Sequence, residues 1–156
     1  MSKSNFKVKG VGTIIKNAVI GKGTVIWNYV NLYNCTIGEN CTIGSYVEIG
    51  EDVKVGDNCK IEAYTFIPKG VTIGNRVFIG PRVTFTNDKH PKAVGEWTVT
   101  PTTVKDDASI GAASVILPGV TVGEHSLIGA GSVVTCDVAS FEVVYGEKAL
   151  VKRVLH

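Results

Sequence analysis

Aliphatic residues recur at every sixth position through most of this 156-residue chain. Small or β-branched residues stand four places after most of them, and glycine often follows them directly. The aliphatic positions are Ile14, Ile20, Ile26, Leu32, Ile37, Ile43, Ile49, Val55, Ile61, Ile67, Ile73, Ile79, Val104, Ile110, Ile116, Val122, Ile128 and Val134. A period of six is neither helical nor the simple alternation of a strand, so it indicates one short strand and one turn, repeated.

Three such units predict a triangular coil of about eighteen residues, with parallel coils stacked roughly 4.8 Å apart. Identical positions then lie above one another, so Ile43, Ile61 and Ile79 form one column and Cys41 lies over Cys59. Each buried aliphatic side chain contributes roughly 1.5–3 kcal/mol. A single unit cannot bury its apolar face, whereas a stack can. The expected fold class is therefore all-β, a parallel β-helix.

Two places depart from the rhythm. The step from Leu32 to Ile37 is five residues, which predicts a tightened corner. After Ile79 the series stops at "FTNDKHPKAVGEWTVTP", residues 85–101, which bears proline, glycine, charges and Trp97. Because long segments without regular structure are usually functional or disordered in a compact domain, we expect this one to help form a site.

The repeat therefore predicts a single domain. Its expected parts are coils at about 11–85 and 104–138, an inserted projecting loop at 86–103 and a C-terminal cap at 139–156. Within the cap we expect a strand near Val143–Tyr145 and a short helical turn at about 147–154, since parallel stacks need covered ends.

Composition narrows the class of function. The hydrophobic share is 44%, which is enough for a core. A net charge of +2 is too small to argue for nucleic acid or an anionic membrane as partner. No apolar run has the length of a signal peptide or a bilayer span. The four cysteines show no CxxC pairing, which favours reduced thiols and a cytoplasmic location.

The repeat, with "IGAGSVV" at 128–134, resembles the hexapeptide-repeat acyltransferases. That resemblance implies a left-handed parallel β-helix, a homotrimer with sites between subunits, and acetyl-CoA as co-substrate. It also implies that the pantetheine arm lies along small residues, here Gly111, Ala112, Ala113 and Ala130, although small residues equally make tight corners. Cationic candidates for the CoA phosphates are Lys148, Lys152 and Arg153, where the chain departs from the family's "GNPAK" segment.

The interrupting segment is similar to that of one branch of this family. "FTND", the later "TP" and "VKDDASIGA", and the upstream "VIWNYVNLYNCTIG" carry the likeness. Members of that branch N-acetylate nucleotide-linked amino sugars, including UDP- and dTDP-3-amino sugars for surface polysaccharide. The resemblance implies that Asn87 lies beside the sugar amine, where an amide can accept a hydrogen bond. The alternative is that Asn87 and Asp88 form a turn.

A base is needed less by an amine than by a hydroxyl, because a neutral amine attacks a thioester readily. His90 is a candidate for substrate contact, for an exposed loop position or for a general base. In the branch, the leaving CoA thiolate is able to accept the proton. Further candidates for nucleotide and sugar recognition are Asn28, Tyr29, Glu62 and Arg82, each of which is equally compatible with a surface role.

Three other functions remain open from the sequence. A hexapeptide O-acyltransferase would act on a sugar or serine hydroxyl and depend on a His base. A zinc enzyme on this scaffold needs clustered histidines, whereas this chain has only His90, His125 and His156, so no metal is expected. A non-catalytic β-helix that binds surfaces such as ice would show ladders of outward threonine, but the outward positions here are mixed and charged.

Overall fold

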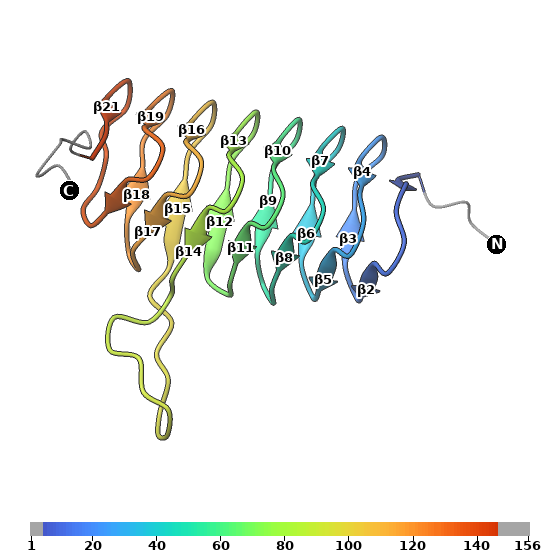
Figure 1. Ribbon diagram of the computed structural model, residues 1–156, viewed down its shortest axis with the longest axis horizontal. Helices are drawn as coiled ribbons and strands as arrows, with labels where there is room; N and C mark the ends of the chain where they lie inside the picture. Colours follow the sequence, from blue (N-terminus) through green and yellow to red (C-terminus); the bar gives the residue numbers. More distant parts are fainter. Residues whose placement is uncertain (1–4, 147–156) are drawn as a thin grey trace, which may run out of the picture.

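The computed structural model describes residues 5–146, which form three parallel sheets wound around one axis (Figure 1). Sheet 1 contains β1 (Lys7–Val8), β4 (Val25–Ile26), β7 (Thr42–Ile43), β10 (Lys60–Ile61), β13 (Phe78–Ile79), β16 (Ser109–Ile110), β19 (Leu127–Ile128) and β21 (Val143–Val144). Sheet 2 contains β2 (Ile14–Lys16), β5 (Asn31–Tyr33), β8 (Glu48–Ile49), β11 (Phe66–Ile67), β14 (Thr84–Phe85), β17 (Val115–Ile116) and β20 (Val133–Val134). Sheet 3 contains β3 (Val19–Ile20), β6 (Thr36–Ile37), β9 (Lys54–Val55), β12 (Val71–Ile73), β15 (Thr102–Val104) and β18 (Thr121–Val122).

The strand register confirms the predicted stacking except at Ile14, because Ile15 pairs with the buried Leu32 and packs against the core, whereas Ile14 is exposed. Ile61 pairs with Ile43 on one side and with Ile79 on the other, and all three are fully buried. Successive coils are joined by backbone bonds such as Gly44 N–H to Ile61 O at 2.8 Å. The aliphatic column and the hydrogen-bonded ladder therefore follow the same axis, and each coil depends on its neighbours for both.

The stack of strands extends beyond the predicted coil limits at both ends. β1 begins before residue 11, and β21 extends the stack beyond residue 138, close to the strand predicted at Val143–Tyr145. The corner between Leu32 and Ile37 is tight as predicted, since only Asn34 and Cys35 separate β5 from β6. The predicted helical turn at 147–154 lies outside the described residues. None of the described residues forms a helix that could cross a membrane.

The four cysteines form no disulfide in the structure. Cys35, Cys41 and Cys59 are buried, whereas Cys136 is exposed. The thiol of Cys41 donates to the Gly56 carbonyl oxygen at 3.1 Å, one coil further along. These cysteines thus act as small interior residues that also satisfy backbone acceptors.

The loop is an insertion that leaves the register unchanged. Between coils, hydrogen-bonded partners are usually 18 residues apart, as for Glu39 and Asp57, but across the loop they are 31 apart, so thirteen residues are added. β12 nevertheless pairs with β15 over three residues, Val71 with Thr102 through Ile73 with Val104. The added segment projects from the stack between β14 and β15 (Figure 1).

The three edges of the prism turn through left-handed backbone. Edge 1–2 is the edge where the chain passes from sheet 1 to sheet 2, and the other edges are named likewise. Edges 2–3 and 3–1 mostly place Asn, Asp or Gly at this position, residues that tolerate a positive φ. Edge 1–2 differs, because it successively carries Gly12, Tyr29, Tyr46, Tyr64, Arg82, Ala113 and Gly131.

Polar side chains tie the coils together at edge 3–1. Asp57 Oδ1 accepts the Glu39 N–H at 2.7 Å, Asn75 Oδ1 accepts the Asp57 N–H at 2.8 Å, and Asp106 Oδ1 accepts the Asn75 N–H at 2.9 Å. These bonds satisfy backbone donors that the strands leave unpaired at the turn. The residues in each coil thus cap the coil before it.

At the same edge Asp107 accepts two hydrogen bonds from Arg76, Nε to Oδ1 at 2.7 Å and Nη2 to Oδ2 at 2.6 Å. These bonds and the guanidinium charge lower the pKa of the Asp107 carboxyl. A pKa lowered by folding stabilises the fold above the unfolded value of about 4, and this contribution is lost as pH falls through the folded value.

We therefore expect Asp107→Asn to lower the melting temperature at pH 7, with the difference from the unchanged protein shrinking below about pH 3. Thermal unfolding followed by circular dichroism at both pH values measures this. Glu96→Gln, which changes an exposed carboxylate on the loop, is the matched control. A difference that stays constant with pH would contradict the ion-pair explanation.

Candidate functional site

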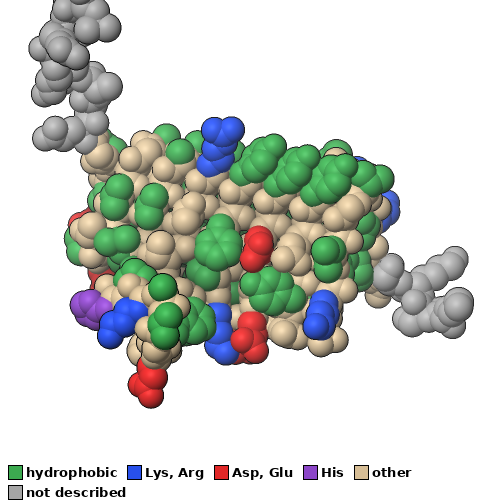
Figure 2. Space-filling model, turned by 60° about the horizontal axis from the view of Figure 1, so that its bottom comes forward, with side chains coloured by type: hydrophobic (Ala, Val, Ile, Leu, Met, Phe, Trp, Pro, Cys, Tyr) green, Lys and Arg blue, Asp and Glu red, His purple; other side chains and the backbone are tan. Residues whose placement is uncertain are grey.

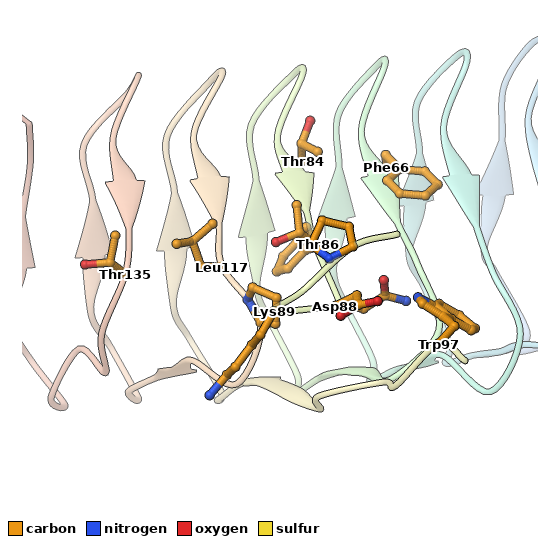
Figure 3. Close-up of a pocket in the computed structure, with 12 residues that line it drawn as sticks. Phe66, Thr84, Thr86, Asp88, Lys89, Trp97, Leu117 and Thr135 are labelled. Carbon is orange, nitrogen blue, oxygen red and sulfur yellow. The ribbon is translucent and has the colours of Figure 1, made fainter. Parts of the chain in front are cut away.

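A large hollow lies on sheet 2, between its outer face and the start of the projecting loop. It has a volume of about 670 Å³. Figure 3 shows Phe66, Thr84, Leu117 and Thr135 on successive coils, with Asp88, Lys89 and Trp97 on the loop below them. The full lining is Phe66, Thr84, Phe85, Thr86, Asn87, Asp88, Lys89, Pro91, Trp97, Leu117, Pro118 and Thr135. Ligand sites commonly combine a rigid scaffold, here the outer face of sheet 2, with polar groups on an adjoining loop.

Asn87 anchors the start of the loop to the preceding coil and to the end of the loop. Its Nδ2 donates to the Lys69 carbonyl oxygen at 2.9 Å, and its own carbonyl accepts the Thr100 N–H at 2.8 Å. Since a carbonyl oxygen only accepts, the amide NH₂ group must face Lys69, and Oδ1 is the atom left to accept a bond from a ligand. The side chain is half-buried and lines the hollow.

Asp88 follows it and also lines the hollow. Its Oδ1 accepts the His90 N–H at 2.8 Å, which fixes the carboxylate in an Asx turn. The expected turn at residues 87–88 therefore exists, and it coexists with a place in the hollow for both side chains. A carboxylate held here favours a cationic or hydrogen-donating ligand group.

The rest of the hollow is apolar with one cation at its rim. Phe66 and Trp97 are 39% and 56% exposed, so both offer ring surface to a ligand. Lys89 reaches across Gly119, where a built Cβ would lie 3.5 Å from Lys89 Nζ. Within residues 5–146, Lys89 has no carboxylate in ion-pairing distance.

A second, smaller hollow of about 250 Å³ adjoins the first. The two share Phe66, Asn87 and Trp97, and the smaller one is completed by Tyr33, Glu51, Pro68 and Lys69. Asn87 therefore faces both hollows, and a ligand bound at its free Oδ1 is able to extend into either.

The structure places the predicted recognition residues on edge 1–2, not in the hollow with Asn87. Tyr29, Tyr46 and Tyr64 stack there, with ring centroids 5.0 and 4.8 Å apart, and Arg82 lies 5.7 Å from the Tyr64 ring. Figure 2 shows this as a row of hydrophobic side chains along one edge, ending at a basic one. Asn28 and Glu62 have partners of their own, since Asn28 Oδ1 accepts the Val11 N–H and Glu62 pairs with Lys60 at 2.7 Å.

On the two coils after Arg82 the same edge carries small residues. Gly111, Ala112, Ala113 and Ala130 lie here, as the resemblance implies for the pantetheine arm. A Cβ built on Gly131 would meet nothing within 4 Å, so the backbone is open to approach. Among the described residues, the Ala112 and Ala130 N–H groups have no hydrogen-bond acceptor.

Other predicted residues lie apart from the hollow. The His90 side chain is exposed and is not among those that line the hollow. His125 lies at a turn with a positive φ, and its ring stacks on Phe141 with the centroids 5.0 Å apart. Lys148, Lys152 and Arg153 lie outside the described residues.

An acidic group with one histidine occurs on edge 3–1. Possible ligand atoms of Asp107, Glu124 and His125 lie within 4.8 Å of one another. Asp107, however, already receives both of its bonds from Arg76. We read this group as part of the ion-pair cluster that joins these coils.

The repeats match a known family. The model of the bacterial transferase hexapeptide family, described as six repeats, matches residues 17–51, 34–69, 52–87 and 101–136. The chain belongs to this family. Its repeats imply a left-handed winding for the β-helix, as expected from the sequence, and the chain stays in register across the one break in the match, which falls on the loop.

Individual relatives differ in what they acetylate. Galactoside O-acetyltransferase of Escherichia coli is 42% identical over 88 residues, 53% of this chain and 43% of that enzyme. A dTDP-3-amino-3,6-dideoxy-alpha-D-galactopyranose 3-N-acetyltransferase of Aneurinibacillus thermoaerophilus is 51% identical over 51 residues, 33% of this chain and 27% of the enzyme. The chain thus spans less than half the length of these curated relatives.

The fold is shared with solved structures. An N-acyltransferase from Bacillus cereus, AntD, superposes with a TM-score of 0.70 and 24% identity, covering 85% of this chain and 80% of that one. At this identity the likeness concerns the β-helix itself.

Of the residues that line the hollow, Asn87 alone was proposed from the sequence to contact a ligand. Asp88 was assigned only to a turn, and Phe66 sits at an outward repeat position that looks like any other. Trp97 was noted only as part of the loop. The one available signal for Phe66 was a large aromatic residue at a position where neighbouring coils carry Glu48 and Thr84.

Proposed function

We propose that this protein is an acetyl-CoA-dependent N-acetyltransferase that modifies the amine of a nucleotide-linked amino sugar, with a 3-amino sugar for surface polysaccharide as the specific expectation. The observation that carries the proposal is that the Asn87 amide and the Asp88 carboxylate line the same largely apolar hollow. The 51% identity with a sugar 3-N-acetyltransferase supports the choice of an amine.

The two polar side chains suit an amine. Asn87 Oδ1 accepts an N–H of the neutral amine without removing its proton, and this orients the nitrogen lone pair away from the loop. As the new C–N bond forms, positive charge develops on the nitrogen, and the Asp88 carboxylate stabilises that charge. Phe66 and Trp97 cover the apolar faces of a sugar ring and limit the access of water.

The small residues of edge 1–2 suit an extended co-substrate. The Ala112 and Ala130 N–H groups have no acceptor among the described residues, and we propose them as donors to the amide oxygens of this co-substrate. When bound, acetyl-CoA supplies the acetyl group as a thioester, whose sulfur leaves as a thiolate able to take the proton released by the amine. Lys148, Lys152 and Arg153 stay candidates for its phosphates on the strength of the resemblance.

The loop favours assembly as a homotrimer. Val94 is 88% exposed and Trp97 is 56% exposed in the single chain, which leaves apolar surface on a projecting segment. A neighbouring copy placed against sheet 2 would cover this surface and close the hollow. We further propose a cytoplasmic location, in agreement with four free cysteines.

A hexapeptide O-acetyltransferase is the second candidate. It is favoured by the 42% identity with a galactoside O-acetyltransferase over 53% of the chain. A hydroxyl acceptor needs a base, and the candidate is His90, whose side chain is outside the hollow in the single chain. His90 would therefore have to act on the site of a neighbouring copy.

Thiol release from acetyl-CoA across UDP- and dTDP-linked amino sugars and simple galactosides separates the two functions. We expect turnover with an amino sugar, and we expect His90→Ala to keep it within about threefold, since no protein base is required. Lys92→Ala, which changes another exposed residue of the same loop, is the control. Turnover confined to hydroxyl acceptors and abolished in His90→Ala would overturn the proposal.

A further inference from the structure

A cluster of charged side chains beside the smaller hollow holds more carboxylates than ammonium groups. Lys69 Nζ lies 3.0 Å from Glu51 Oε2 and 3.1 Å from Asp52 Oδ2, so one ammonium is shared by two carboxylates. Glu48 adds a third carboxylate, whose Oε1 accepts the hydroxyl of Tyr33 at 3.2 Å. Glu51 and Lys69 line the hollow, whereas Asp52 and Glu48 lie just behind it, so the cluster as a whole holds three carboxylates against one ammonium at neutral pH.

On the face that carries the projecting loop, Figure 2 shows acidic side chains set among hydrophobic ones. The negative electrostatic potential of the carboxylates near the smaller hollow acts on Tyr33, which lines it. The pKa of Tyr33 is raised by burial of the phenol and by the nearby carboxylates of Glu48 and Glu51. The same field that opposes a phenolate opposes any other anion at this place. The pKa of Lys69 is raised by Glu51 and Asp52, so its charge is retained but already paired.

The position of the hollow decides which part of a ligand enters it. Asn87 and Trp97 line both hollows, so an amine bound at Asn87 Oδ1 lies at their junction. The phosphates of a nucleotide-linked acceptor are drawn to Lys89, on the larger hollow, where no described carboxylate pairs with the ammonium. The ring substituents on the other side of the amine then face Tyr33, Glu51 and Lys69.

From this arrangement we infer that the acceptor is an amino sugar whose ring carries no carboxylate, and that Glu51 is a specificity-determining residue that rejects amino-uronic acids. This inference rests on the proposed function and adds the substrate class to it. A neutral hydroxymethyl or methyl group suits the apolar surface of Phe66, Pro68 and Trp97, whereas a carboxylate there is repelled by Glu51, which lines the hollow, and by Glu48 behind Tyr33.

The test uses two nucleotide-linked amino sugars that share the nucleotide and the amine and differ only in a neutral group or a carboxylate at C6. The specificity ratio is kcat/KM for the neutral acceptor divided by kcat/KM for the carboxylated one. We expect this ratio to be at least about ten at low ionic strength and to fall towards one in about 0.5 M salt. Glu51→Gln should narrow the ratio several-fold, because it removes one negative charge and leaves Lys69 paired with Asp52.

Lys69→Gln should act in the opposite direction and widen the ratio, since it removes the only cation of the cluster while the backbone carbonyl that holds Asn87 is retained. Opposite signs from two neighbouring side chains exclude a general loosening of the loop. Glu39→Gln, an exposed carboxylate on edge 3–1, is the control and should leave the ratio unchanged.

Equal or preferred use of the carboxylated acceptor would overturn the inference and leave the proposed N-acetyltransferase standing. A ratio that is unmoved by both Glu51→Gln and Lys69→Gln would overturn the role of Glu51. No turnover with either amino sugar, in an enzyme that acetylates a hydroxyl acceptor, would overturn the proposed function and this inference with it.

Discussion

Asn87→Ala is expected to lower kcat/KM for an amino-sugar acceptor by about a hundredfold or more, because it removes the atom that orients the amine and also one anchor of the loop. The Asn87 Nδ2 bond to the Lys69 carbonyl and the Thr100 bond to the Asn87 carbonyl close the neck of the loop. Losing the side-chain bond leaves Asp88 and Trp97 less well placed. Steady-state release of CoA thiol measures the effect.

The fold should survive this change. The substituted side chain lies outside the stacked core, so we expect a loss of only about 1 kcal/mol in the free energy of unfolding. Thr98→Ala, which alters an exposed loop residue that does not line the hollow, is the matched control and should keep nearly full activity. Activity of Asn87→Ala within threefold of the unchanged protein would show that the amide makes no contact with the reacting amine.

Gly111→Ala is expected to lower the free energy of unfolding by roughly 3 kcal/mol, although it adds only one methyl group. A Cβ at this position would lie 2.8 Å from Ala130 Cα and from Gly129 C, and closer still to the Ala130 nitrogen. All three are backbone atoms of the next coil, so no side-chain rotation relieves the overlap. The two coils must separate locally, which weakens bonds such as Gly111 N–H to Ile128 O at 2.7 Å.

Gly131→Ala provides the comparison at a nearby glycine. A Cβ there would meet nothing within 4 Å, and the only cost is that of a left-handed backbone at φ 71°, about 1 kcal/mol. Chemical denaturation of both variants gives the difference. Equal stabilities for the two variants would mean that the coils yield easily to an added methyl group, against the close packing inferred here.

Most of the fold could be predicted because one physical requirement is repeated at every coil. An aliphatic side chain must enter the interior at a fixed step, and the register of Ile43, Ile61 and Ile79 follows from that step alone. The tight corner before Ile37 was visible as a five-residue step. Handedness came from the family resemblance, since a spacing does not distinguish the two senses of winding.

The site was less accessible to prediction, because its parts come from elements that no local pattern connects. Asn87 was found through a motif, but Phe66 reaches the same hollow from a coil about twenty residues earlier and Leu117 from a coil after the loop. Repeat counting places each of these residues on the outer face of sheet 2. Repeat counting does not show that residues of the loop line the same hollow. The path of the loop depends on hydrogen bonds such as the one from Asn87 Nδ2 to the Lys69 carbonyl oxygen.

The preserved pairing of β12 with β15 across thirteen added residues has an evolutionary consequence. Neither strand has to shift when the segment between them changes length or composition, so the stacked coils and the projecting loop can change independently under selection. A loop from one enzyme of this architecture should be exchangeable for another at the Thr86 and Pro101 junctions without refolding the prism. New acceptor specificities would then arise by replacing the loop, while the stacked coils stay as they are.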